Sequence, residues 1–538
     1  PFVLHTTIVA KLRICGKTMI SDEGDVTAAK IGIVGGGVSG ISALQQLHSY
    51  NPILFEASSF VGGVWRSAVY NSTKLQSSRK DYEFTDFLWP EREDASFPSH
   101  NQVVDYLESY VDEFNLRQHI KFNSKVVEIR YLRNDNSDDF ATRDGEYEEL
   151  LPGQPVWEVT VQVNNDAIQR YAFEFLVICT GKYGDVARIP QFSAHQGPEI
   201  FNGKVLHTLD YCKLSADEAR QLVKDKRVAI IGFKKSAIDL AVECAQANQG
   251  PEGKPCTMVV RTLHWTVPHY WVWGLPFFLF FSTRMSQLLH EKPNQTPLMT
   301  LFCLLFSPMR HAVSKFIETY LLHKLPLKKY GLQPEHPFIE DYASCQMAIM
   351  PEEFFPEADK GKIAFKRSFK WWFYDGGIEF EDGEKLEADV VIYATGYDGK
   401  QKLKNVIPKP FSYLLEDTAG LMPLYRGTIN PLIPNMAFVG YIESVSNLHT
   451  AELRSMWLAR LLAGEFKLPS IHKMLDQVAK EIEVMKRATR FYKRHCISTF
   501  SINHGDEICE EMGWSSWRKK NMLAELLSPY GSEDYKQK

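Results

Sequence analysis

The sequence predicts an α/β protein with two Rossmann-like dinucleotide-binding domains, the second inserted into a discontinuous first domain. Two kinds of feature predict this fold class. Near residues 30–47 and 227–240, a β-rich run leads into a turn of small residues and then into a helical pattern, and two further apolar runs end in Thr-Gly. The chain has 538 residues, more than one hydrophobic core usually supports, so we expect at least two domains.

The first turn follows a predicted strand at 30–34. It has the pattern G-x-G-x-x-G from Gly35 to Gly40, and a second strand ends at Glu56, about twenty residues on. A side chain at Gly37 would keep a pyrophosphate away from the helix N-terminus, whose free N–H groups and dipole attract it. Glu56 can bind the two ribose hydroxyls. The alternative, a turn that only closes a strand–helix corner, is weaker because strand, glycines, helix and acid agree.

The second turn, 232–237, has the sequence GFKKSA and follows a predicted strand at 227–231. Lys234 occupies the place where a dinucleotide fold usually has its middle glycine, which makes this turn less specific. Arg261 follows the next strand, where a guanidinium favours a 2′-phosphate and therefore NADPH over NADH. The alternative is a surface arginine at a strand end, downstream of a purely structural turn.

Two apolar runs, 175–181 and 388–396, end in Thr180-Gly181 and Thr395-Gly396, the second after a probable hairpin at 381–384. Small residues at such strand ends let the chain pass close to a cofactor. Generic buried strands explain these runs equally well.

Composition excludes several function classes. Hydrophobic residues make up 44% and charged residues 24% of the chain, as in ordinary globular proteins, and the net charge of −5 argues against nucleic acid as a partner. The nine cysteines are scattered without a C-x-x-C pair, so we expect neither a disulfide framework nor a metal site. Free thiols favour a reducing compartment, and we expect a cytoplasmic protein, with a peripheral location at the endoplasmic reticulum as the alternative.

Between the two turns, Phe201, Gly203, His207 and Tyr211 form the pattern F-x-G-x-x-x-H-x-x-x-Y, and the sequence GGVW at 62–65 follows the first acid. With these motifs the chain resembles the class B flavin-dependent monooxygenases. Related Baeyer–Villiger enzymes carry Trp at the place of Tyr211, so the resemblance favours N- or S-oxygenation over insertion into ketones. A histidine that only satisfies local packing is the alternative for His207.

Within that family the chain is most similar to the plant group called flavin-dependent monooxygenase one, with shared segments at 232–240, 270–278 and 495–502. The resemblance implies that NADPH reduces FAD, that O2 adds to the flavin as a C4a-hydroperoxide, and that oxygen passes to a small amine. The group's activity is N-hydroxylation of pipecolic acid in plant systemic defence. The resemblance also identifies the GFKKSA turn as the group's own variant.

One position departs from the family pattern. Many members have an Asn near the flavin in the loop 73–79, where this chain offers Gln76 as the nearest amide and the single Asn71 just before the loop. Gln76 is our candidate catalytic residue, and an ordinary loop glutamine is the alternative. The cofactor-binding residues that we expect from the motifs and the resemblance are Gly35, Gly36, Gly37, Val38, Ser39, Gly40, Glu56, Gly63, Val64, Trp65, Thr180, Gly181, Gly203, His207, Gly232, Phe233, Lys234, Lys235, Ser236, Ala237, Arg261, Thr395 and Gly396.

These motifs place the domain boundaries. We expect an N-terminal extension over 1–29, disordered and with Met19 as the natural start. The FAD-binding domain then covers 30–215 and 386–480, an NADPH-binding domain with a helical insertion covers 216–385, and a C-terminal extension covers 481–538.

The apolar stretches 270–282 and 301–306 are too short to span a membrane. We interpret them as core or substrate entrance rather than as a membrane contact, and the basic residues 486–494 as a solvated helix face.

Two other function classes stay open on sequence grounds. The missing loop Asn and Lys234 are compatible with an NADPH oxidase that releases hydrogen peroxide. A nucleotide-sensing protein without catalysis is the third possibility, because folds persist when activities are lost.

Overall fold

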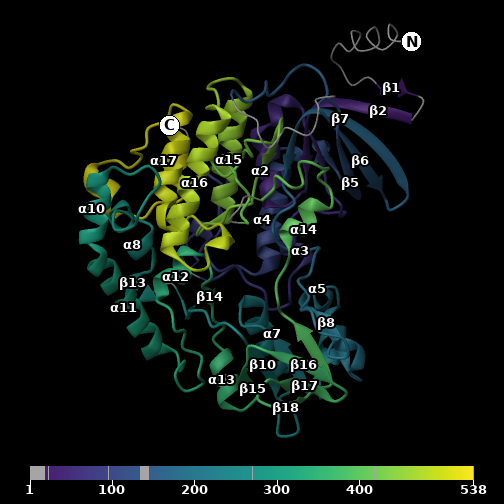
Figure 1. The fold of residues 1–538 in the computed structure, drawn as a ribbon, viewed down its shortest axis with the longest axis vertical. Helices are drawn as coiled ribbons and strands as arrows, with labels where there is room; N and C mark the ends of the chain where they lie inside the picture. Colours follow the sequence, from purple (N-terminus) through teal and green to yellow (C-terminus); the bar gives the residue numbers. More distant parts are fainter. Residues whose placement is uncertain are drawn as a thin grey trace.

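Two sheets organise two halves of the molecule (Figure 1). The computed structural model describes residues 18–21, 24–94, 96–133, 145–269, 271–416 and 420–536. Within these residues the first sheet has eight strands in the order β4-β3-β2-β7-β6-β5, with β1 beside β2 and β20 beside β7. Its strands are β1 (Thr18–Ser21), β2 (Gly24–Val34), β3 (Ile53–Phe55), β4 (Ile120–Lys121), β5 (Ser124–Tyr131), β6 (Trp157–Val163), β7 (Ala167–Ile178) and β20 (Met436–Phe438).

The second sheet is parallel throughout, with the order β15-β10-β9-β19-β8. Its strands are β8 (Lys204–His207), β9 (Val228–Ile231), β10 (Cys256–Val260), β15 (Ile363–Arg367) and β19 (Val390–Tyr393). Smaller pairings join β11 (Thr266–Val267) to β14 (Ala348–Ile349), β12 (Trp271–Val272) to β13 (Leu275–Pro276), and β16 (Trp371–Tyr374) to β17 (Gly377–Phe380) and β18 (Lys385–Glu387). The α/β fold with two Rossmann-like units and the hairpin at 381–384 are confirmed.

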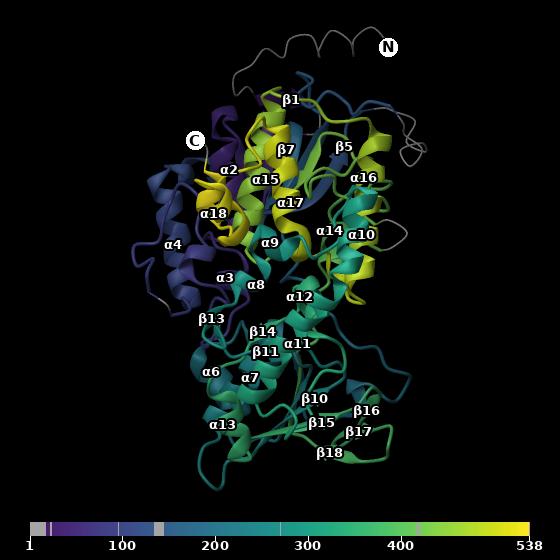
Figure 2. The same cartoon turned by 90° about the vertical axis from the view of Figure 1, so that its left-hand side faces the viewer.

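Helices cover both sheets. In the first half, α2 packs against α15, and Figures 1 and 2 show α16 and α17 beside them. In the second half, α7 packs against β9 and β10. The helices are α2 (Val38–Gln46), α3 (Val64–Ser67), α4 (His100–Glu113), α5 (Thr208–Tyr211), α6 (Ala216–Val223), α7 (Lys235–Ala247), α8 (Phe278–Phe281), α9 (Arg284–Gln287), α10 (Pro297–Leu305), α11 (Ser307–Lys324), α12 (Phe338–Ala343), α13 (Phe354–Asp359), α14 (Gly399–Lys404), α15 (Asn447–Leu462), α16 (Ile471–Ala488), α17 (Ser501–Glu511) and α18 (Met522–Leu527).

The strand pairings correct three expected boundaries. Residues 1–17 lie outside the described part, but β1 and the start of β2 occupy part of the expected disordered extension. β8 and β19 belong to the second sheet, although we expected both in the first domain. Buried apolar strands look alike in either sheet, and only the pairings of β19 with β9 and of β8 with β19 distinguish them.

The C-terminal boundary at 480/481 is also wrong, because it cuts through α16. Met474 and Ile482 of α16 and Ile508 of α17 are buried in the same hydrophobic core as α2 and α15. The C-terminal segment is therefore part of the first half rather than an appendage to it.

The apolar stretches divide between interior and surface. In 270–282, Phe277 and Phe281 are buried, whereas Trp271 and Leu275 are 53% and 46% exposed, so the interpretation as core holds for only part of this stretch. The interpretation is wrong for α10, where Leu298, Leu304 and Leu305 are 77%, 68% and 66% exposed. A helical pattern does not reveal that a neighbouring layer is missing on its outer side. Among the described residues, no helix has the length and apolar character needed to cross a bilayer.

Candidate active site

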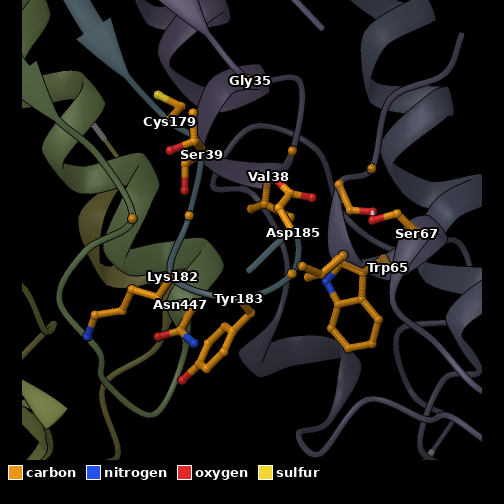
Figure 3. A pocket seen from close by; sticks show the side chains of 18 of the residues that line it. Gly35, Val38, Ser39, Trp65, Ser67, Cys179, Lys182, Tyr183, Asp185 and Asn447 are labelled. Carbon is orange, nitrogen blue, oxygen red and sulfur yellow. Dashed lines mark hydrogen bonds between the residues drawn. The ribbon is translucent and has the colours of Figure 1, made fainter. Parts of the chain in front are cut away.

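A cavity of about 1270 Å³ opens at the carboxyl ends of β2, β3 and β7, the edge where open α/β sheets bind ligands. Figure 3 shows Lys182 and Asn447 on one side of it and Trp65 on the other. Many of the residues that the sequence identified line this cavity, namely Gly35, Gly36, Gly37, Val38, Ser39, Glu56, Gly63, Val64, Trp65, Gln76, Thr180 and Gly181. Gly40 lies behind them, where a Cβ would approach the Gly35 carbonyl oxygen to 1.8 Å.

Two facing glycines form a cradle at the N-terminus of α2. Gly37 is the N-cap of α2, and a Cβ on Gly63 would lie 3.1 Å from the Gly37 Cα. The backbone is therefore bare on both sides of the place where the free N–H groups of α2 begin. This geometry fits a pyrophosphate, because an anion reaches the helix N-terminus without meeting a side chain.

Glu56 lies at the end of β3 with its carboxylate already oriented. Oε2 accepts a hydrogen bond from the Gly36 N–H (2.7 Å) and Oε1 accepts one from the Ser58 N–H (2.7 Å). The side chain lines the cavity, and the two N–H groups fix the orientation of its carboxylate. An acid held in this way fits ribose hydroxyls, and this role of Glu56 stays a prediction.

A charged network that sequence reasoning missed lines the other side of the cavity. The Glu443 carboxylate accepts hydrogen bonds from Lys182 Nζ (3.2 Å), the Tyr183 hydroxyl (2.8 Å) and Arg494 Nε (3.0 Å). Burial alone raises the pKa of Glu443, but the guanidinium and the ammonium lower it below its ordinary value. Two cations share one carboxylate here, which makes this wall attractive to a further anion.

The positions of these residues along the chain are a partial signal for this network. Lys182 and Tyr183 directly follow Thr180-Gly181, and Arg494 precedes the shared segment 495–502. The interpretation of 486–494 as a solvated face is wrong for Arg494, because its guanidinium bonds the buried Glu443.

Gln76 lines the cavity from the loop after α3. Its amide oxygen accepts a hydrogen bond from the Ile349 N–H of β14 (3.0 Å). The amide therefore connects the first half of the molecule to the second, and its role toward a bound flavin stays a prediction.

The second turn lies between β9 and α7, outside the cavity. Gly232 has a φ of +142°, and a Cβ there would lie 2.6 Å from the Ala394 carbonyl oxygen, so glycine is required. Phe233 and Ala237 are buried in the core of the second half, and the Lys235 ammonium pairs with Asp239 (2.5 Å). Ser236 lies in the first turn of α7. These positions contribute backbone or packing rather than an obvious side-chain ligand.

Two basic groups accompany this turn. Lys234 is the N-cap of α7, its ammonium donates to the Gln346 amide oxygen, and burial lowers its pKa to about 8. Arg261 is exposed directly after β10 and stays the predicted 2′-phosphate ligand. Cations beside a helix N-terminus fit the phosphates of a dinucleotide.

The remaining expected positions support the connection between the halves. The Thr395 hydroxyl donates to the Arg188 carbonyl (2.5 Å), and the Arg188 N–H donates to the Gly396 carbonyl (2.9 Å). His207 is 2% exposed and its Nδ1 accepts from the Leu209 N–H (3.0 Å). A Cβ on Gly203 would lie 2.5 Å from the Asp389 carbonyl oxygen. Gly203 and His207 thus pack the start of the second sheet.

Cys345 and Cys496 form one disulfide, where the scattered cysteines predicted free thiols without a disulfide framework. The two lie 151 residues apart, so no local spacing could reveal the bond.

His264, His336 and Asp341 form a cluster that could be mistaken for a metal site. Asp341 accepts from His264 Nδ1 (2.7 Å) and the Trp265 N–H (2.6 Å), and its second oxygen lies 2.8 Å from His336 Nε2. In this structure the three side chains therefore form a hydrogen-bonded triad.

Known proteins share this architecture. The family model described as flavin-binding monooxygenase-like matches residues 28–527. The chain is 62% identical over 520 residues to "Probable flavin-containing monooxygenase 1" of Arabidopsis thaliana, covering 96% of this chain and 98% of that protein. It is 25% identical to human flavin-containing monooxygenase 5 over 91% of this chain and 83% of that protein.

Solved structures agree in fold. The closed crystal structure of cyclohexanone monooxygenase has a TM-score of 0.63 at 16% identity, covering 90% of this chain and 97% of that one. S-allyl-L-cysteine S-oxygenase from Allium sativum has a TM-score of 0.55 at 19% identity, covering 91% of this chain and 89% of that one. The glycine cradle, the oriented acid and the family match lead to one conclusion: the chain is an FAD- and NADPH-dependent oxygenase of the flavin-binding monooxygenase-like family.

Proposed function

We propose that the protein N-hydroxylates a small amine or amino acid, with pipecolic acid the best candidate, and acts in plant systemic defence signalling. The observation that carries the proposal is that one cavity combines the glycine cradle with an apolar wall of Val267, Phe277 and Tyr342. Lys182 and Arg494 line the same cavity. An apolar ring with a carboxylate matches such a mixed wall, because the ring buries apolar surface and the carboxylate meets a cation.

Bound FAD, reduced by NADPH, supplies the oxygen activation. The protein's own residues bind, orient and exclude water. Tyr82, 6% exposed, accepts a hydrogen bond from Trp65 Nε1 (2.8 Å) and fixes this ring at the cavity wall. Tyr211 stands where the resembling Baeyer–Villiger enzymes have Trp, and this difference supports amine oxygenation. The Tyr211 hydroxyl donates a hydrogen bond to Glu243 (3.2 Å). Product analysis with pipecolate and NADPH tests the proposal.

A second candidate, a peroxide-releasing NADPH oxidase, is favoured by the exposed position of Gln76 in place of the family's Asn. Replacing Gln76 by Ala separates the two. If Gln76 retains activated oxygen, we expect Gln76→Ala to shift NADPH consumption from hydroxylated product to hydrogen peroxide, by roughly tenfold for one lost hydrogen bond. Asn71→Ala, just before the same loop, is the matched control. An unchanged ratio of product to peroxide in Gln76→Ala removes Gln76 from the catalytic machinery.

NADPH binding should depend on the charge of Lys234. Its pKa of about 8 means that the ammonium deprotonates as the pH rises through that value, and an anionic phosphate then loses its cation. We expect the KM for NADPH to rise above pH 8, and Lys234→Met to raise it roughly 10–100-fold at pH 7 and to abolish the pH dependence. Lys224→Met, exposed on the same half, is the control. A wild-type KM that is flat between pH 7 and about 9 would contradict this role.

We also propose that the exposed face of α10 contacts an anionic lipid surface. The run 296–309 contains no charged residue, and Arg310 and Lys315 follow it on α11. Figure 1 shows α10 and α11 at the outer edge of the molecule, with nothing packed outside them. Apolar helices with adjacent cations bind in the headgroup region without crossing the bilayer.

Vesicle sedimentation measures this contact. We expect binding to vesicles with anionic lipid, weaker binding to neutral vesicles, and at least a tenfold loss when Leu298, Leu304 and Leu305 are replaced by Ser, because each buried leucine contributes about 1.5–3 kcal/mol. Leu523→Ser, equally exposed on α18, is the matched control. Wild-type protein that stays in the supernatant with anionic vesicles rules the contact out.

A further inference from the structure

Cys345 and Cys496 join two segments that meet at the cavity wall. Cys345 follows α12 in the second half, and Cys496 lies just before the short helix η7 (Ser498–Phe500), with a Cα–Cα distance of 5.8 Å. The Glu443 N–H donates to the His495 carbonyl, and the Ile497 N–H donates to the Glu443 carbonyl, each at 2.9 Å. The bond therefore ties the NADPH-binding half to the segment that is paired with Glu443.

The two sulfurs differ in access. Cys345 is half-buried and lines the cavity, whereas Cys496 is 2% exposed and lies behind it. The Ser498 hydroxyl lies 3.0 Å from the Cys345 sulfur and 2.9 Å from the Cys496 sulfur. A small oxidant in the cavity meets Cys345 first and finds Cys496 within bonding distance of it. This order suits a reacting thiol backed by a resolving thiol.

The other described cysteines contrast with this pair. Cys179, Cys244, Cys256, Cys303 and Cys509 are buried and unbonded, and burial raises the pKa of the half-buried Cys212 to about 12. One disulfide among otherwise free thiols is not a structural framework. Disulfides of proteins in a reducing compartment are usually transient and catalytic or redox-sensing.

The segment that begins at Cys345 contacts both cofactor sites. Gln346 accepts a hydrogen bond from Lys234 of the second turn, and the Ile349 N–H donates to Gln76 of the first half. Within four residues after Cys345, the chain thus bonds one residue of each half. The disulfide to the C-terminal segment therefore restrains the movement of the segment that begins at Cys345 relative to both turns.

We infer that Cys345 and Cys496 are a modification site for hydrogen peroxide, a dithiol whose oxidation fastens the C-terminal segment to the NADPH-binding half. The Cys345 thiol gives up its proton and its sulfur attacks one peroxide oxygen. The O–O bond breaks, sulfenic acid forms, and the leaving oxygen takes up the proton to form water. The Cys496 thiol then attacks that sulfur, the S–O bond breaks, and the disulfide forms with release of a second water. Two thiols lose two electrons and two protons in total, and one peroxide is reduced to two waters. An external dithiol reverses the step. The inference does not depend on the identity of the amine.

The test uses the FAD-loaded full chain, reduced with dithiothreitol and then exposed to hydrogen peroxide without NADPH or amine. We expect the wild type to lose two titratable thiols and to yield a peptide cross-linked through Cys345 and Cys496. Cys345→Ser should lose none, and Cys212→Ser should behave like the wild type. Limited proteolysis should cleave the C-terminal segment more slowly in the oxidised wild type than in the reduced one, and dithiothreitol should restore fast cleavage.

Three results would overturn the inference. The first is a wild type that keeps all its thiols at peroxide concentrations that oxidise free glutathione. The second is a two-thiol loss that persists in Cys345→Ser, which would assign the reaction to another pair such as Cys244 and Cys256. The third is a cross-link that leaves proteolysis of the C-terminal segment unchanged. If Cys345→Ser does not fold, the cross-linked peptide of the wild type decides between the pairs by itself.

Discussion

Replacing Gly37 by alanine should give a folded protein that no longer retains FAD. A Cβ at this position has the Gly63 Cα as its nearest neighbour at 3.7 Å, an ordinary contact, so the fold should tolerate it. The same methyl group stands at the N-terminus of α2, where the pyrophosphate must approach the free N–H groups. Losing two charge-assisted hydrogen bonds of about 1.5–3 kcal/mol each weakens FAD binding at least about 100-fold.

Flavin absorbance of the purified protein and titration of the apoprotein with FAD measure this effect. Gly531→Ala is the matched control, because nothing lies within 4 Å of a Cβ at this position and it is far from the cradle in sequence. Gly40→Ala gives the opposite comparison, since its Cβ would collide with the Gly35 carbonyl and should prevent folding. A Gly37→Ala protein that retains stoichiometric FAD would place the pyrophosphate elsewhere.

Glu443→Gln should produce the largest loss of stability among substitutions in the cavity wall. The carboxylate compensates the two cations Lys182 and Arg494 and is itself 5% exposed. Removing one member of a buried charge network leaves the others uncompensated and costs about 3–5 kcal/mol. We expect a clear fall of the melting temperature in thermal denaturation of the purified protein.

The pH dependence follows from the pKa of Glu443. The pKa of Glu443 in the folded protein lies below its ordinary value. Its contribution to the free energy of unfolding is therefore complete at pH values above the ordinary pKa. The contribution is lost as the pH falls through the lower pKa of the folded protein. Wild type and Glu443→Gln should therefore converge in acid. Glu93→Gln, in the exposed pair with Lys80, should change the free energy of unfolding by less than about 1 kcal/mol. Equal losses for the two variants would show that the network does not stabilise the cavity wall.

The sequence predicted the parts of the molecule that are encoded locally. The glycine turn from Gly35 to Gly40 and the acid Glu56 lie within a single βαβ unit, where spacing alone implies geometry. The Gly232 turn was recognisable for the same reason, because its strand and helix adjoin it.

Contacts over long separations escaped prediction. Arg494 meets Glu443 and Cys496 meets Cys345 only after the C-terminal segment folds back onto the first half. β19 was assigned to the wrong sheet because its apolar run fits either one, and only the pairing with β9 decides. The exposure of α10 depends on what packs outside it, which no periodicity within the helix contains.

We propose that the cavity which holds FAD also holds a small amine whose nitrogen receives oxygen. The most direct test incubates the FAD-loaded protein with NADPH, O2 and pipecolate, and quantifies NADPH consumed, N-hydroxylated product and hydrogen peroxide in one reaction. We expect N-hydroxylated product in proportion to the NADPH consumed, with little hydrogen peroxide. Consumption of NADPH that yields peroxide and no hydroxylated amine would contradict it.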